Sequence, residues 1–408
     1  MAENETRRAI TVKLLSGGTW RSLLLAVLLL AVVRRSLELG TLANVDALGG
    51  TILTLTLLAL INATFGFGLG LAAGSYLTRA KRRAPVLTWA CALYGAILCV
   101  AALSSSLPVF LLLIGCATGI GVFINAGETM IETGYLDSET EIVTANALRG
   151  ATLQSLQLIA PLIAGTLLAL VAPRMLIVIA AITSIIPLLV FARLPLEVRT
   201  DEQTGTSATT LPALLRAIRG HVAHDRDLQI FFSVQAMVMI VLGMQGPLIF
   251  TYIIEERGFE VPQFAFLMAA LGAGALLSAG LFIWTSMRPS LTLIMALLTL
   301  DGVALLAFVL TDIPALIFGS MAAMGLIGGV YMIVMRSFLQ SRSEADGRDT
   351  LIAAFYGIQE PFLMMGLVFL LLILPFFTAS QILLGASLVE IGLSAALLLA
   401  APKNPARL

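Results

Sequence analysis

Apolar runs of twenty or more residues recur from one end of this 408-residue chain to the other. A run of about 20 apolar residues is the length that an α-helix needs to cross the hydrocarbon core of a bilayer. The composition agrees, because 59% of the residues are hydrophobic, only 12% are charged, and the mean hydropathy is +1.00. The chain is therefore predicted to be an all-α polytopic membrane protein.

Twelve membrane-spanning helices are predicted, each an apolar run bounded by charges or turn residues. Between the sixth and the seventh lies the one long polar segment, which reads as a flexible linker followed by a short amphipathic helix at the membrane surface. The pattern gives an N-terminal six-helix bundle (1–194), a cytoplasmic linker with an amphipathic helix (195–227) and a C-terminal six-helix bundle (228–408). The predicted spans are 19–43, 48–78, 84–105, 107–134, 143–171, 174–194, 228–254, 262–286, 290–311, 313–339, 350–376 and 379–401.

The basic residues are distributed unevenly between the two sides of the predicted membrane protein. If both termini lie in the cytoplasm, most Lys and Arg side chains fall on that side, and only Arg174 and Arg257 face outward. Cytoplasmic loops of membrane proteins carry such an excess of positive charge. We therefore expect a multi-pass protein of a bacterial-type inner (cytoplasmic) membrane with both termini in the cytoplasm.

The two halves of the chain resemble each other weakly. The residues GVF at 121–123 begin 24 positions before Ala145, and GVY at 329–331 begins 24 positions before Ala353, at an offset of 208 residues. An offset close to half the chain length favours a duplicated six-helix unit. Two pseudo-symmetric bundles of this kind create the central cavity that alternating access requires.

The loop after the second predicted span contains a motif with a known counterpart. Residues 74–83, GSYLTRAKRR, resemble the G-x-L-A-D-R-x-G-R-R signature between helices two and three of the major facilitator superfamily. Thr78 stands in place of the aspartate and Lys81 in place of the second glycine, so the latch that the aspartate forms in the family must here be weaker or built from other groups. The resemblance implies the major facilitator fold, with a cytoplasmic gate at Gly74, Thr78, Arg79, Arg82 and Arg83.

Further stretches resemble narrower groups within this superfamily. The segments at 142–165, 266–280 and 324–348 resemble helices five, eight and ten of macrolide-efflux-type drug and siderophore exporters. Lysophospholipid transporters share the A-N-x-L pattern of the first segment nearly as well, so the substrate is left open. The resemblance also implies that helices one, four, seven and ten line the cavity, while three, six, nine and twelve support them.

Ionisable side chains inside membrane helices are costly, and function is the default explanation for them. The first predicted span contains Arg34, Arg35 and Glu38, and spacings of three and four residues allow one or both arginines to reach the glutamate. Either the three charges form a self-neutralising cluster near the outer end of the helix, or they leave an excess positive charge facing the cavity. The second interpretation favours a substrate with an anionic group.

Carboxyl groups inside the predicted spans are candidates for proton coupling, because a carboxyl group at low dielectric can exchange its proton near neutral pH. We assign this role to Glu128, Glu360 and Glu38. Glu360 precedes Pro361, which frees a backbone carbonyl and permits a kink in the helix. We therefore expect this kinked helix, which carries a carboxyl group, to move during transport.

Static ion pairs are the alternative for two of these carboxylates. Glu128 could pair with Arg149 or Arg336 as a gate bridge, and Glu360 with Arg336. Glu132 lies one helical turn after Glu128 and is assigned to the cytoplasmic gate together with the two arginines.

Uncharged polar and sulfur-containing side chains complete the candidate substrate contacts. The amides fit bonds between helices equally well, and methionine is also ordinary packing material. Asp301 and Glu390 fall on predicted support helices, where we expect protonated carboxyl groups hydrogen-bonded inward and assign no substrate role. The residues assigned to substrate binding are Arg34, Arg35, Glu38, Gln154, Gln157, Gln245, Met244 and Met332.

Other classes of function lack their motifs in this sequence. There is no G-x-S-x-G, no histidine in any predicted span and no G-x-x-x-x-G-K-[ST] loop. We therefore expect neither an enzyme nor an ATP-driven pump, and no cofactor, metal or nucleic-acid partner.

The sequence predicts a secondary active transporter that works by alternating access and couples protons to the export of an amphipathic small molecule, such as a drug or an anionic siderophore. The alternative is a lysophospholipid flippase of the same fold. The expected partners are the substrate, protons and the lipid bilayer, and the expected state is a monomer.

Overall fold

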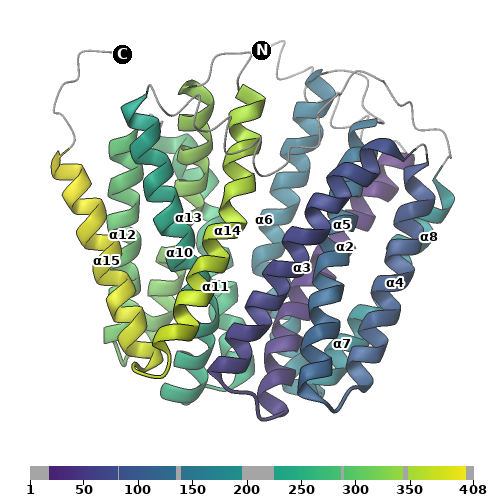
Figure 1. Ribbon diagram of the computed structural model, residues 1–408, viewed down its shortest axis with the longest axis horizontal. Coiled ribbons are helices and arrows are strands. Elements are labelled where there is room, and N and C mark those ends of the chain that lie inside the picture. Colours follow the sequence, from purple (N-terminus) through teal and green to yellow (C-terminus); the bar gives the residue numbers. More distant parts are fainter. Residues whose placement is uncertain are drawn as a thin grey trace. The chain divides into compact units, whose positions relative to one another are not determined.

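The computed structural model of the chain describes residues 18–80, 82–134, 139–194, 225–285, 289–342 and 348–400. Within these ranges the regular backbone is helical and contains no strand (Figure 1). The chain divides into two compact units, Met1–Ala208 and Thr209–Leu408, which are described here one at a time.

The described part of the N-terminal unit is built from helices. Its sixth span is interrupted at Ser184, where two helices meet. The helices are α2 (Gly18–Ala47), α3 (Ile52–Arg79), α4 (Arg83–Leu103), α5 (Leu107–Gly134), α6 (Glu139–Leu170), α7 (Pro173–Thr183) and α8 (Ile185–Arg193).

The first described helix of the C-terminal unit is well capped. The Asp225 carboxylate accepts hydrogen bonds from the backbone amides of Asp227 at 2.8 Å and Leu228 at 3.2 Å, which satisfies donors that the first turn leaves free. The helices are α10 (Arg226–Thr251) with its π-helical continuation η1 (Tyr252–Glu256), α11 (Val261–Thr285), α12 (Leu291–Leu310), α13 (Pro314–Arg342), α14 (Arg348–Ile373) and α15 (Ala379–Ala400).

The expected fold of twelve membrane helices is confirmed, and most helix ends lie within a few residues of those predicted. In the described part of the chain, nine helical spans are long and apolar enough to cross a membrane, and α6 and α14 contain shorter apolar stretches. The charged helix α2 is not among the nine. Of the predicted linker, residues 195–224 lie outside the described ranges, and so does the whole of the amphipathic helix predicted there.

Glycines let helices approach closely in both units. In the C-terminal unit, a Cβ on Gly274 of α11 would overlap the carbonyl oxygen of Ala322, and one on Gly325 of α13 would overlap that of Leu271. In the N-terminal unit, a Cβ on Gly119 of α5 would lie 2.8 Å from the carbonyl oxygen of Phe65 on α3. Small residues at such crossings replace side-chain contacts by backbone contacts, which is how membrane helices pack tightly.

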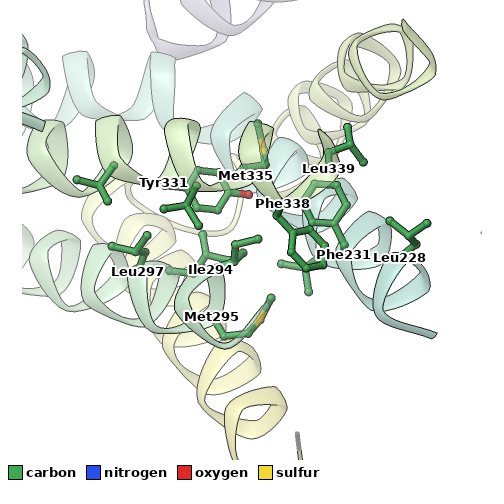
Figure 2. Packing of buried hydrophobic residues seen from close by; sticks show 13 residues of the cluster. Leu228, Phe231, Ile294, Met295, Leu297, Tyr331, Met335, Phe338 and Leu339 are labelled. Atoms are coloured by element: carbon green, nitrogen blue, oxygen red, sulfur yellow. The ribbon is translucent and has the colours of Figure 1, made fainter. Parts of the chain in front are cut away.

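A buried apolar cluster fills the C-terminal unit between α10, α12 and α13 (Figure 2). The rings of Phe231 and Phe338 lie tilted against each other, with centroids 5.5 Å apart. At the other end of the cluster lie Leu297 and the ring of Tyr331, whose hydroxyl is the polar atom visible in Figure 2. These two residues also line the cavity described below.

Candidate functional site

Arg34 connects two helices of the N-terminal unit. Its Nη1 donates to the carbonyl oxygen of Gly121 on α5 at 3.3 Å, and its Nε donates to that of Leu30 at 3.4 Å. The side chain is half-buried. Arg34 therefore reaches across to α5 and makes its hydrogen bonds there and within α2.

Arg35 forms the ion pair with Glu38 that the three-residue spacing allowed. Its Nη1 lies 3.1 Å from Oε2 of Glu38, and the two side chains are 51% and 60% exposed. An ion pair this exposed contributes little to stability. The three charges of α2 are thus divided into an exposed pair and one half-buried arginine.

Buried polar groups of α4 and α5 lie in the same region as Arg34. Glu128 on α5 is fully buried, and so is Tyr94 on α4, with 1% exposure. Cys91, one turn before Tyr94, lies within electrostatic range of both Glu128 and Arg34, and Tyr94 lies within range of Arg34. These four residues place one basic and one acidic group in the same interior region of the N-terminal unit.

The C-terminal unit contains a cavity of about 240 Å³ between α10, α12, α13 and α15. Its lining is mainly Val, Leu, Ile and Met side chains. Four polar side chains interrupt this apolar surface, and no basic side chain occurs among its lining residues. The polar four are Gln245, Asp301, Tyr331 and Glu390.

The two carboxyl groups of the cavity are held without a cation in the described lining. Glu390 is 4% exposed, and its Oε2 has no hydrogen-bond partner within the described structure. Asp301 lies within electrostatic range of Glu390, and Tyr331 within range of both. The Tyr331 hydroxyl donates to Oε1 of Gln235 at 2.5 Å, so its oxygen remains available as an acceptor.

Hydroxyl groups link the two helices that carry the carboxyl groups. Thr299 on α12 and Ser394 on α15 lie 2.8 Å apart, and the Ser394 hydroxyl lies 2.5 Å from the carbonyl oxygen of Glu390. Thr299 is two residues before Asp301. Helices α12 and α15 pack against each other (Figure 1). This contact fixes the backbone of the two residues whose carboxyl groups line the cavity.

The remaining predicted residues are dispersed. Gln245 and Met332 line the cavity. Met244, the residue before Gln245, is buried, and Gln157 on α6 is half-buried. Two predicted proton or gate residues of the C-terminal unit, Glu360 and Arg336, are exposed.

The predicted gate falls mostly on side chains that the structure does not describe. Arg82 is exposed, and Nε of Arg83 donates to the carbonyl oxygen of Leu77 at 3.0 Å. That bond ties the start of α4 to the last turns of α3. For the other gate residues and for Gln154, the structure describes only the helical backbone. These residues are Gly74, Thr78, Arg79, Glu132, Arg149 and Gln154.

Sequence reasoning did not anticipate the cavity. The sequence shows Asp301 and Glu390 as charges in apolar helices. The family resemblance, however, implied that these helices support the cavity-lining helices and do not line the cavity themselves. The signal that could have found the site is the pair of hydroxyl residues, Thr299 and Ser394, each within four residues of a carboxyl group. Polar residues at helical spacing on two membrane helices indicate an interhelical contact.

The chain belongs to the major facilitator superfamily, because the model of the family described as Major Facilitator Superfamily matches residues 14–360. This is a family of membrane transporters, which supports the expectation of a transporter rather than an enzyme. A search of curated proteins finds no match to this chain.

Solved structures of transporters share the fold. The nucleoside transporter NupG has a TM-score of 0.73 at 14% identity, covering 94% of this chain and 98% of NupG. A mutant of the peptide transporter POT has a TM-score of 0.71 at 14% identity, covering 93% and 94%. A bacterial homolog of the human lysosomal transporter Spinster has a TM-score of 0.67 at 12% identity, covering 94% and 95%. None of these three is a macrolide-efflux-type exporter, so that narrower resemblance stays a prediction.

Proposed function

We propose that the protein is a secondary active transporter that exports an amphipathic small molecule with an anionic group in exchange for protons. It works by alternating access in an inner membrane, as a monomer with both termini in the cytoplasm. The observation that carries the proposal is the arrangement around Arg34, where a half-buried guanidinium and the fully buried Glu128 share one region of the N-terminal unit.

Arg34 is the group proposed to bind the anionic part of the substrate. A guanidinium has five N–H donors in a planar fork that matches a carboxylate or phosphate. Within the described structure, the Arg34 guanidinium donates to two carbonyl oxygens, which leaves donors for a ligand. Arg35 and Glu38 neutralise each other at 3.1 Å, and we assign them a secondary part in attracting the substrate.

Glu128 is the leading candidate for the proton carrier. It is 0% exposed, and a buried carboxylate is costly unless it is protonated or compensated by a cation. A change in its surroundings between two transporter states would therefore change its proton occupancy. Glu38 and Glu360 remain candidates, but both are exposed, so their environment supports this role less.

Transport by purified protein in proteoliposomes tests the substrate class. The assay compares a carboxylate-bearing siderophore with a labelled lysophospholipid, each with and without an imposed pH gradient. Siderophore movement driven by the gradient is expected. Movement of the lysophospholipid alone would replace the proposed exporter by a flippase of the same fold.

The proton assignment has its own test. Glu128→Gln, Glu360→Gln and Glu38→Gln are measured singly for the pH dependence of transport, with the exposed Glu260→Gln as the control. We expect Glu128→Gln to flatten the pH profile and the control to leave it unchanged. An unchanged profile in all three variants contradicts the proposed coupling.

A further inference from the structure

We propose that the cavity between α10, α12, α13 and α15 binds a small lipophilic ammonium ion, with the cationic head at Asp301 and Glu390 and the apolar body against the surrounding side chains. The inference concerns equilibrium binding within the C-terminal unit. It does not rest on the proposed function, because neither the direction nor the coupling of transport enters it.

The two carboxyl groups of the cavity favour a cationic ligand. Two carboxyl groups line one cavity, Glu390 is almost completely buried with one oxygen lacking a partner, and the described lining contains no basic side chain. Two ionised carboxylates in apolar surroundings repel each other and lose hydration, so the pair either takes up protons or binds a cation. A bound cation offsets both costs through its attraction to the carboxylates, and a primary ammonium can donate up to three hydrogen bonds to the carboxylates and to the Tyr331 oxygen.

The size and lining of the cavity favour an organic cation over a metal ion. Its volume of about 240 Å³ is far more than a bare ion occupies. Calcium takes about six to eight oxygen ligands and magnesium a near-ideal octahedron. No group of three or more His, Cys, Asp or Glu suited to a metal occurs among the described residues. Val241, Leu298 and Met332 instead offer an apolar surface for a hydrocarbon body.

The polar groups are positioned before any ligand arrives. The contact between Thr299 and Ser394 joins α12 to α15, and the hydrogen bond from Tyr331 to Gln235 joins α13 to α10. A site held by such bonds loses little conformational freedom on binding, which favours affinity.

Gly328 provides a way to fill the cavity without altering its charges. This glycine of α13 lines the cavity, and a Cβ built on it would have no atom within 4 Å. Gly328→Leu therefore directs a side chain into open space, and leucine is a better helix former than glycine. The variant should fold normally while it excludes a ligand.

The test is isothermal titration calorimetry of the purified full-length protein in uncharged detergent at neutral pH. The probe is phenethylamine, which is protonated under these conditions, and phenethyl alcohol is its neutral isostere. The variants are Glu390→Gln, Asp301→Asn and Gly328→Leu, with Glu260→Gln as the matched control because Glu260 is exposed in the same unit and does not line the cavity.

We expect phenethylamine to bind the natural protein and Glu260→Gln equally, and to bind each of the three cavity variants at least about tenfold more weakly. Phenethyl alcohol should bind more weakly than the amine by a similar factor. The proposal is overturned if the natural protein does not bind the amine, if the alcohol binds as tightly, or if the cavity variants retain full affinity. Gly328→Leu decides the matter should a carboxyl variant fail to fold.

Discussion

In the N-terminal half Arg34 reaches from α2 to the backbone of α5, near the buried Glu128. In the C-terminal half Asp301 and Glu390 line a cavity without a basic residue in its described lining. Both halves use glycines where their second and fourth helices cross, at Gly119 and at Gly325. The two halves therefore pack their second and fourth helices in a similar way but differ in their buried charges. Buried charge depends on a few side chains, whereas helix packing depends on many.

The largest expected effect tests the packing side of this comparison. Gly325→Leu should destabilise the protein by about 3 kcal/mol or more, because its nearest atoms are backbone atoms of Leu271, which cannot move aside. Gly115→Leu should cost less, since the side chains of Ile61 and Phe65 that it meets can adjust. Thermal unfolding of the purified protein measures both. Equal losses of stability would show that both halves tolerate an added side chain at these helix crossings equally well.

The next effect concerns the basic residues of the N-terminal half. Arg34→Met should lower transport of an anionic substrate by at least about tenfold, because it removes the guanidinium proposed to bind the anion. Arg35→Met should lower it by less than about threefold, because Arg35 already pairs with Glu38. Initial rates in proteoliposomes provide the measurement. The reverse ranking would move the proposed binding group from Arg34 to Arg35.

A smaller effect sets one buried carboxyl group against the other. Glu128→Gln should lower the free energy of unfolding by about 1–3 kcal/mol, since an amide cannot replace the negative charge of the carboxylate in a buried region that also contains Arg34. Glu390→Gln should raise it by about 1 kcal/mol, because an amide is less costly to bury beside Asp301 than a second carboxylate. Denaturation of both variants in the same detergent supplies the two values. Shifts of the same sign would contradict the difference between the halves.

The smallest effect lies at the end of α10 distant from the linker. Arg257 donates to the Tyr252 hydroxyl at 2.6 Å and the Val309 carbonyl at 2.8 Å, and it also pairs with Asp312. Arg257→Lys should cost about 1 kcal/mol because an ammonium cannot reproduce this fork. Asp312→Asn should cost less than about 0.5 kcal/mol, since the Asp312 side chain is 84% exposed and its charge is screened by solvent. Thermal unfolding resolves the order, and a larger loss for Asp312→Asn would contradict it.

The fold could be predicted because bilayer thickness fixes helix length, so the apolar runs alone locate the membrane helices. The interruption at Ser184 was missed because the prediction rested on the length of the apolar run, although Pro187 lacks the N–H that would bond the carbonyl oxygen of Thr183. Run length carries no information about where a helix is interrupted within the membrane.

The candidate site could be predicted only in part. The spacing of Arg34, Arg35 and Glu38 gave the possible pairs, but the choice of Arg34 for Gly121 depends on how α2 lies against α5. Asp301 and Glu390 are 89 residues apart in the sequence. Their meeting depends on the rotation of α12 and α15 about their own axes, which no local pattern records.

The hydrogen bonds at the end of α10 have a consequence for motion. Tyr252 and Arg257 both donate to the carbonyl oxygen of Val309, at 2.8 Å each, so this end of α10 and the end of α12 move together. Ten residues before Arg257 stands Pro247, inside α10, and a proline leaves the carbonyl four residues earlier, at Gly243, without its helical donor. Bending of α10 is therefore concentrated near Pro247, two residues from Gln245 in the cavity wall. A tilt of the part of α10 before Pro247 would have to carry or break the Tyr331–Gln235 hydrogen bond, and it would change the width of the cavity while Asp301 stays on α12.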